Sequence, residues 1–310
     1  MNQTFRRLTL AVAVLATSLA ATAPAEPVPT TATADQQVIV ATAPPARPAM
    51  WQVRDADTII YLFGTVHALP PGVNWLHGPV AAAFDGSQEL VTEIVESDSA
   101  GMQGAVLTKA TLPAGKSLRA MLTAPQRRAF EATLQTNGLP SAIFDRFKPW
   151  YAAMVLSTLP VLREGYNPEN GVEALLDARA KAAKQPHSAL ESAEYQLGLF
   201  DSLPHATQLR YLNEVVADLP KASDEIAQMI DAWKQGDADT LARLMNEEED
   251  APELMELLLY NRNRIWAEWI KARLDRPGTV FMAVGAGHLA GEGSVQQVLA
   301  AKGIASTRLQ

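Results

Sequence analysis

The chain has 310 residues, 48% of them hydrophobic, a formal net charge of −8 and no cysteine. A chain of this size can bury a core in one large domain or two small ones, and the absence of cysteine excludes disulfides, thiolate-bound zinc and thiol nucleophiles. Lysine and arginine form no cluster of the kind that binds a phosphate backbone, so we expect no nucleic-acid partner.

Residues 1–25 are typical of a secretory signal peptide. Arg6 and Arg7 precede a short apolar run, and small residues lead to a cleavage site after Ala25. An uncleaved membrane anchor is the alternative interpretation, but the apolar run barely reaches the length that spans a bilayer. We therefore expect a periplasmic or secreted protein with no stable membrane span after cleavage.

A flexible linker is expected after the signal peptide. Residues 26–49 consist almost entirely of Pro, Ala, Thr and Val, so the folded domain is placed at residues 50–310. Strand-like runs at residues 51–54 and 58–63 flank a short acidic turn and predict a β-hairpin. The second of these runs leads directly into a Gly-x-x-His motif.

The rest of the chain alternates between strand and helix signals. A short helix at about 76–85 precedes an apolar strand at Glu89–Val95, and the chain ends with a strand at 279–284, a helix at 294–302 and a strand at 304–309. Further helices are predicted at about 123–138, 149–163, 171–184, 193–200, 204–217, 222–234, 238–245 and 251–274. This order predicts an α/β fold with a central mixed β-sheet. A large helical insertion, at about 115–275, is expected between the two Gly-x-x-His strands.

Two apolar strands end in the same motif. Gly64 is followed by His67, and Gly285 is followed by His288. In α/β folds, ligand sites collect at the carboxyl ends of the strands, and glycine allows the backbone to approach a bound atom closely. Because imidazole is a common ligand of divalent transition metals, two such turns at neighbouring strand ends would offer both histidines to one ion.

Three charged residues are candidates to complete this site. Glu93 lies in an apolar strand, where an unpaired carboxylate would be costly, so it is either a core ion pair, for example with Arg262, or a metal ligand or general base. Glu191 is either a second carboxylate or a helix N-terminal residue. Arg262 is either an ordinary ion pair or a group that binds a substrate carboxylate or steadies an oxyanion. The remaining histidines are expected to be solvated or capping residues: His77, His187 and His205.

Several short motifs follow one another in a characteristic order. They are Tyr61-Leu-Phe-Gly-Thr-Val-His67, Val91-Thr-Glu93, Lys148-Pro-Trp150, Gly171-Val-Glu173, Leu190-Glu191 with Gln196-Leu197, Trp233-Lys-Gln-Gly-Asp237, Arg262-Asn263 and Val284-Gly-Ala-Gly-His288-Leu-Ala-Gly291. Together they cover residues 51–310 and resemble the TraB/PrgY/GumN family. That family is similar to the Tiki metalloproteases and, more distantly, to the EreA/ChaN-like proteins, some of which bind haem.

The resemblance implies a divalent metal ion, manganese or cobalt rather than zinc. Its ligands would be His67, His288 and Glu93, and the turns that present the histidines would be shaped by Gly64 and Gly285. This set matches the residues that the strand-end pattern selects independently.

The resemblance also implies catalytic roles for Glu93, Glu191 and Arg262. One departure from the family pattern is that its usual Gly-x-Asp reads Gly171-Val-Glu173 here, which lengthens that carboxylate. We therefore expect a metal-dependent hydrolase, a peptidase that acts on peptides or protein termini in the periplasm. The alternative on the same fold is a non-catalytic binding protein for a peptide signal, haem or a metal.

Overall fold

The structure, a computed structural model, describes residues 45–95, 99–245 and 252–310. The predicted signal peptide and most of the predicted linker lie outside these residues. The last linker residues, 45–49, already pack on the domain: Ala46 and Ala49 are buried, and the backbone N–H of Ala46 donates to the carbonyl of Asn74 at 2.8 Å. The folded part therefore begins before Met50, because these small residues fill space beside the domain.

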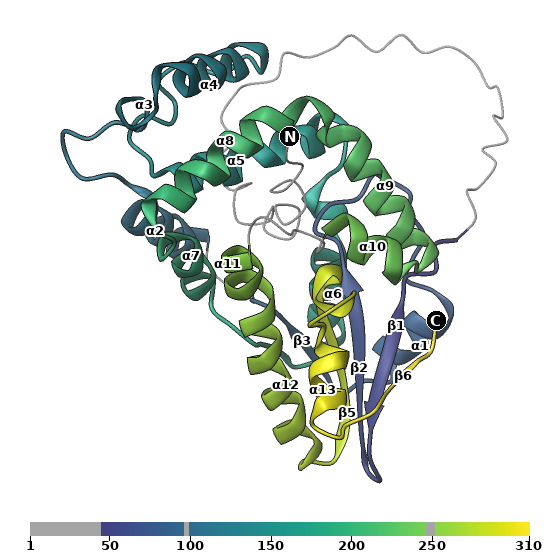
Figure 1. Ribbon diagram of the computed structural model, residues 1–310. Helices are drawn as coiled ribbons and strands as arrows, with labels where there is room; N and C mark the ends of the chain where they lie inside the picture. The colour runs from purple at the N-terminus through teal and green to yellow at the C-terminus, as the bar shows by residue number, and fades with distance from the viewer. Residues whose placement is uncertain (1–44, 96–98, 246–251) are drawn as a thin grey trace, which may run out of the picture.

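A six-stranded mixed sheet lies at the centre of the molecule, in the order β4-β3-β5-β2-β1-β6 (Figure 1). The strands are β1 (Met50–Arg54), β2 (Thr58–Thr65), β3 (Glu89–Thr92), β4 (His187–Ala189), β5 (Gly278–Gly285) and β6 (Ser306–Arg308). Strands β4, β3, β5 and β2 are parallel neighbours, whereas β1 is antiparallel to both β2 and β6. The predicted α/β class, mixed sheet and β1–β2 hairpin are confirmed. Four parallel carboxyl ends consequently meet at one edge.

Helices make up most of the remaining chain. They are α1 (Gly78–Asp85), α2 (Ser99–Ala110), α3 (Leu118–Met121), α4 (Ala124–Thr136), α5 (Pro149–Arg163), α6 (Val172–Ala183), α7 (Ala193–Asp201), α8 (His205–Asp218), α9 (Ala222–Gln235), α10 (Ala238–Met245), α11 (Pro252–Met255), α12 (Asn261–Leu274) and α13 (Val295–Ala301). A π-helical turn, η4 (Glu256–Tyr260), joins α11 to α12, and short 3₁₀ turns include η2 (Pro168–Asn170) and η5 (Ala286–Leu289). The helical region begins at α2, earlier than predicted, and it contains the short strand β4.

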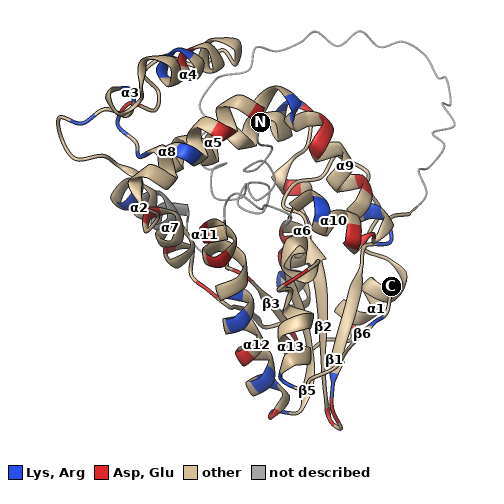
Figure 2. Ribbon diagram, in the orientation of Figure 1, with Lys and Arg blue, Asp and Glu red and all other residues tan. Residues whose placement is uncertain are grey.

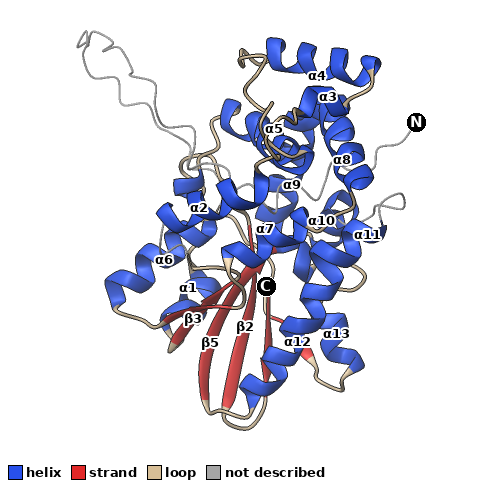
Figure 3. Cartoon of the chain, turned by 90° about the vertical axis from the view of Figure 1, so that its left-hand side faces the viewer, coloured by secondary structure: helices blue, strands red, loops and turns tan. Residues whose placement is uncertain are grey.

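The sheet is covered by helices on both faces. Figure 3 shows α1 and α6 on one side of the strands and α12 and α13 on the other, with the larger helical block beyond one end of the sheet. Side chains of β5 alternate between the two faces: Val280 and Met282 pack in one cluster with Trp266 of α12, and Phe281 packs in another with Phe84 of α1. This period of two is what strands buried on both faces require.

The helical block has a core of its own, built from α2, α4, α5, α7, α8 and α11. Its largest fully buried side chains are Trp150 and Phe130.

In the sheet, β2 and β5 contain no charged residue, and Figure 2 shows the Lys, Arg, Asp and Glu positions mostly on helices and connections. None of the helices within the described ranges is long and apolar enough to cross a membrane.

Two predicted elements differ from the structure in ways that affect the site. The strand expected at Glu89–Val95 ends at Thr92, so Glu93 follows the strand. Oε1 of Glu93 accepts a hydrogen bond from the backbone N–H of Gly285 at 2.8 Å. The Glu93 side chain is therefore bound to the end of β5. The helix expected at 251–274 is interrupted by η4, and residue 251 lies outside the described residues.

Candidate active site

Four predicted site residues follow the four parallel strands at the same edge of the sheet. His67 follows β2, Glu93 follows β3, Glu191 follows β4 and His288 follows β5. Because β3, β5 and β2 are adjacent, residues from distant parts of the chain are brought together. Nε2 of His288 lies 3.8 Å from Oε1 of Glu93, and electrostatic interaction with His67 lowers the pKa of both groups. The structure thus places His288 beside Glu93, with His67 within electrostatic reach of both.

Arg262 of α12 is the central cation of the site, and its side chain is 5% exposed. Nη2 donates to Glu93 at 2.5 Å and to Glu191 at 2.9 Å, while Nε also donates to both oxygens of Glu191, at 3.0 and 3.1 Å. Both carboxylates are held by one planar guanidinium, which suits the bidentate geometry that arginine offers. Of the two interpretations of Glu93, the ion pair with Arg262 is therefore present.

Arg262 also contacts His288. Its Nη1 lies 3.0 Å from Nε2 of the imidazole and 3.0 Å from the carbonyl oxygen of Leu258. Nδ1 of His288 lies 2.6 Å from Oδ1 of Asn263, whose amide nitrogen donates to the carbonyl of Gly293. Since Asn263 Oδ1 can only accept, the imidazole carries its proton on Nδ1 and accepts at Nε2. His288 is therefore neutral.

The titration behaviour of the two buried groups agrees with this arrangement. Burial and the charge of Arg262 lower the pKa of His288 from 6.5 to about 3, although Glu93 opposes the shift. Burial acts to raise the pKa of Glu93, but Arg262, His288, His67 and the N–H of Gly285 together lower it from 4.5 to about 2. At neutral pH the site therefore holds a neutral imidazole and an ionised carboxylate.

The π-helical turn before α12 explains how two consecutive residues reach His288. The backbone N–H of Asn261 bonds five residues back, to Glu256, instead of four. The carbonyl of Leu258 accepts from the Arg262 side chain. Such turns shift the helix register locally and often occur at functional sites. Here the turn lies immediately before Arg262 and Asn263, which contact opposite nitrogens of the imidazole.

Glu191 is enclosed by hydrogen-bond donors. Besides Arg262, it accepts from Nε1 of Trp266 at 2.9 Å and from Nε2 of Gln196 at 3.0 Å. The same amide of Gln196 donates to Glu93 at 2.9 Å, so it joins the two carboxylates. Trp266 also packs against the His288 ring, with 4.3 Å between the ring centroids. Trp266 was not among the candidate residues selected from the sequence.

His67 has a carboxylate partner that sequence reasoning did not assign to it. Its Nδ1 lies 2.7 Å from Oε1 of Glu173, and Thr65 Oγ1 donates to the same oxygen at 2.5 Å. The separation is that of a charge-assisted contact, although the ring nitrogen does not meet hydrogen-bond geometry. The available signal was the Gly171-Val-Glu173 motif, noticed only as a departure from the family pattern.

Both motif glycines lie at close approaches of the backbone. A Cβ on Gly285 would lie 3.1 Å from Oε1 of Glu93, and one on Gly64 would lie 3.1 Å from Cα of Ala286 in the second motif. The two Gly-x-x-His turns are therefore packed against each other, as expected for glycines that shape a shared site.

The donor chemistry of the site suits a divalent ion in most respects. His288 is neutral, with Nε2 as its acceptor, and two metal bonds of about 2.1 Å can span the 3.8 Å between Nε2 and Glu93. Two buried carboxylates, Glu93 and Glu191, share one guanidinium, which leaves an uncompensated negative charge that favours a cation. Asn263 supplies the outer hydrogen bond that orients a metal-binding histidine.

One contact opposes an ion in this arrangement. Among the described residues, no three His, Asp or Glu side chains form a ready metal-binding group. Nη1 of Arg262 faces the lone pair of His288 Nε2 that an ion would need. Its other contacts, with Glu93 and Glu191, are made through Nη2 and Nε and do not depend on Nη1. An ion at Nε2 of His288 would therefore require this one hydrogen bond to be given up.

The remaining histidines lie outside the cluster. His77 contacts the carbonyl of Ala46 at 2.8 Å, and His205 is exposed. His187 was expected to be a solvated or capping residue, but it is partly buried between Thr92, at 2.8 Å, and Asp177, at 3.1 Å. His187 thus contacts the last residue of β3, next to Glu93. Among the contacts of the described residues, none joins His187 to Arg262.

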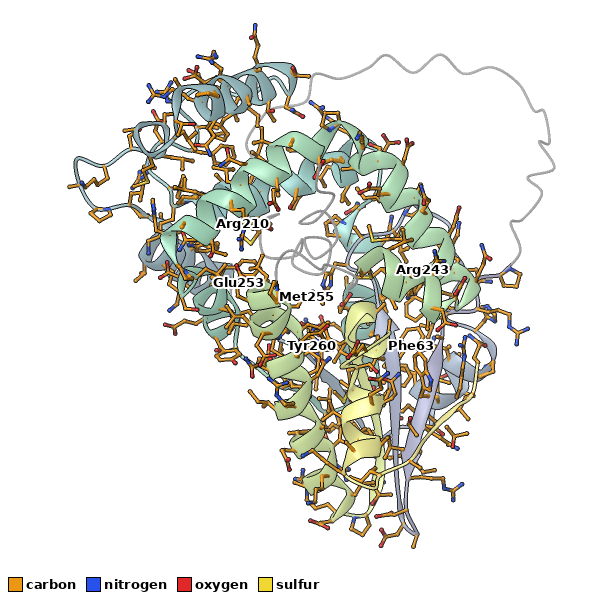
Figure 4. The ribbon with its side chains drawn as sticks, viewed as in Figure 1. Phe63, Arg210, Arg243, Glu253, Met255 and Tyr260 are labelled. Atoms are coloured by element: carbon orange, nitrogen blue, oxygen red, sulfur yellow. The ribbon has the colours of Figure 1, made fainter. Side chains whose placement is uncertain are left out.

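The helix that carries Arg262 is tied to the helical block above the sheet. Figure 4 shows Arg210 of α8 facing Glu253 of α11, with Met255 and Tyr260 further along the segment that descends to α12. Arg210 and Glu253 form an ion pair. The position of Arg262 therefore depends on both the sheet and the helical block.

Comparisons with known proteins agree with the order of motifs. The model of the TraB/PrgY/gumN family matches residues 49–308. The protein is similar to the "Uncharacterized protein YbaP" of Escherichia coli K12 and to that of Shigella flexneri. Each is 29% identical over 194 residues, which cover 61% of this chain and 70% of the relative. No solved structure matches the chain. The chain belongs to the TraB/PrgY/gumN family.

Proposed function

We propose that the protein is a metal-dependent hydrolase, a peptidase that acts on peptides or protein termini in the periplasm. The observation that carries the proposal is the meeting of His67, Glu93 and His288 at one edge of a parallel sheet, beside the buried cation Arg262. The signal-like N-terminus supports export, and the resemblance to the Tiki metalloproteases supports a peptide substrate.

His67, His288 and Glu93 would hold the ion, manganese or cobalt rather than zinc. When bound, such an ion supplies Lewis-acid polarisation of a carbonyl and lowers the pKa of water. A pKa of about 2 makes Glu93 a weak proton acceptor at neutral pH. This favours the role of ligand over that of general base for Glu93.

Arg262 would stabilise negative charge on the substrate. Its Nη1 is the donor that an ion would release from His288, and it would then be available to a substrate carboxylate or a developing oxyanion. Glu191 holds the guanidinium with three hydrogen bonds and receives two more from Trp266 and Gln196. With its oxygens so engaged, Glu191 is suited to positioning Arg262 rather than accepting a proton.

The experiment is a cleavage assay on the mature chain that begins after Ala25. A peptide library with free and blocked termini is incubated with Mn²⁺, Co²⁺, Zn²⁺ or EDTA, and products are identified by mass spectrometry. We expect cleavage that Mn²⁺ or Co²⁺ stimulates, that EDTA abolishes and that His288→Ala reduces by at least about 100-fold. His205→Ala, at an exposed histidine, is the matched control and should retain activity.

The result that would overturn the proposal is an absence of cleavage with every metal by a folded protein. Calorimetric binding of an uncleaved peptide would then support the alternative of a non-catalytic binding protein. Metal-stimulated cleavage that persists in His288→Ala would also contradict the proposed site, because the activity would lie elsewhere.

A further inference from the structure

We propose that Glu173 is the positioning residue for His67: its carboxylate accepts a hydrogen bond from Nδ1–H of the imidazole, and Nε2 is thereby directed to the site. The proposal rests on the proposed function in one respect, that Nε2 of His67 is the atom used there. It concerns a residue of α6, outside the strand-end set formed by His67, Glu93, Glu191 and His288.

The contact itself is short and shielded from solvent. Nδ1 of His67 lies 2.7 Å from Oε1 of Glu173, and the imidazole side chain is 11% exposed. Thr65, the last residue of β2, donates to the same oxygen at 2.5 Å and so fixes the carboxylate from the strand side. The imidazole ring is oriented so that Nδ1 does not meet hydrogen-bond geometry with Glu173. Rotation about χ2 of histidine is a soft torsion, and hydrogen bonds in an unoccupied site often become shorter and better aligned when a ligand binds.

The backbone around Glu173 is fitted to that of His67. The N–H of Val172 donates to the carbonyl of Val66 at 3.1 Å, and Asn167 bridges to Leu69. A Cβ added to Gly171 would lie 2.2 Å from the carbonyl oxygen of His67, so only glycine fits at this point. The segment 167–173 is therefore held against the first Gly-x-x-His turn along its length.

The chemistry of the pair decides which nitrogen faces the site. A carboxylate can only accept, so the proton of a neutral His67 is placed on Nδ1 and the lone pair on Nε2. Glu173 lies in the first turn of α6, where the helix dipole stabilises a negative charge. A carboxylate behind an imidazole orients the ring and raises its basicity, as in many metal-binding histidines.

Asn263 and Glu173 then play matching parts for the two histidines. Asn263, on α12, accepts a hydrogen bond from Nδ1 of His288. Glu173, on α6, contacts Nδ1 of His67. These helices cover opposite faces of the sheet (Figure 3). Each imidazole is thus contacted at Nδ1 by a side chain from a helix outside the sheet. The longer side chain of Glu at position 173 spans the gap from α6 to β2 in this chain.

The test reads the tautomer of His67 directly, in the metal-free protein. Long-range ¹H–¹⁵N spectra, assigned with His67→Ala, report which ring nitrogen carries the proton. We expect the Nδ1–H form in the wild type, a loss of that preference in Glu173→Ala and an intermediate result in Glu173→Gln, which keeps an acceptor of the same shape. Glu169→Ala, an exposed acid in the same segment, is the matched control and should leave the spectrum unchanged.

The affinity for a metal ion provides a second measurement. Titration calorimetry with Mn²⁺ should show binding about 10–100-fold weaker in Glu173→Ala than in the wild type. A His67 tautomer that is the same in the wild type and in both Glu173 variants would overturn the proposal. If the tautomer changes but the wild type itself binds no metal, the positioning role stands and the metal-dependent function falls. If Glu173→Ala does not fold, the isosteric Glu173→Gln decides.

Discussion

Replacing Arg262 by methionine should strongly destabilise the protein, because the guanidinium is the cation shared by two buried carboxylates. Methionine keeps the length and apolar stem of the side chain but leaves Glu93 and Glu191 without their common partner. Removing one member of a buried ion pair costs about 3–5 kcal/mol. Arg262 makes the largest contribution among the groups that lower the pKa of Glu93, so its removal should leave the burial of that carboxylate largely uncompensated.

The free energy of unfolding of Arg262→Met should change with pH in the direction opposite to the contribution that Glu93 makes in the wild type. In the wild type, the folded-state pKa of Glu93 lies below 4.5, so its contribution is complete above pH 4.5 and is lost as the pH falls towards 2. Without Arg262, burial is no longer offset and the folded-state pKa should lie above 4.5. The variant should therefore lose stability as the pH rises above 4.5 and regain part of it in acid.

Urea denaturation followed by tryptophan fluorescence measures both effects, at pH 5 and pH 8. Arg264→Met is the control on the same helix: its ion pair with Glu256 is half exposed, so a change of about 0.5 kcal/mol or less is expected. Adding Glu93→Gln and Glu191→Gln to Arg262→Met should restore part of the stability. A loss below about 1 kcal/mol for Arg262→Met, or one that does not vary with pH, would refute the reasoning.

Three further changes have expected outcomes. Gly171→Ala should lower stability by about 1–3 kcal/mol in thermal denaturation, because its Cβ would overlap the carbonyl of His67. Gly104→Ala, in open space within α2, should instead stabilise by up to about 1 kcal/mol, so an equal effect of both would contradict this. Trp266→Phe should cost about 1–3 kcal/mol through the lost donor to Glu191, and an unchanged urea midpoint would argue against that bond. Mn²⁺ at about 100 times its Kd should add about 2.7 kcal/mol of stability, reversed by EDTA, and no shift in melting temperature would speak against an ion site.

The strand-end part of the site could be predicted from the sequence because it follows from local patterns. Apolar runs that end in glycine mark buried strands, and the parallel pairing of β2 with β5 brings His67 and His288 to one edge. Glu93 was expected inside the strand, but the strand ends at Thr92, immediately before it. Asn263 belongs to the Arg262-Asn263 motif, and its side chain contacts His288.

The helical contributions were less accessible to sequence reasoning. The π-helical turn at Glu256–Tyr260 is only five residues long and lies in a run rich in leucine, so the apolar pattern predicts one continuous helix. Glu173 and Gln196 reach the site only through the way α6 and α7 pack on the strand ends. Such contacts depend on the separation and crossing of helices, which a single sequence does not specify.

The position of β5 between β3 and β2 has a consequence for how the protein folds. Its pairing with β2 closes a loop of about two hundred residues, and contacts of such long range slow folding. A nascent chain that has not yet reached Gly278 can form the β1–β2 hairpin and the β3–β4 pair only as two separate pieces. Strand β5 thus joins the two pieces into one sheet, and His288 arrives at the site with it.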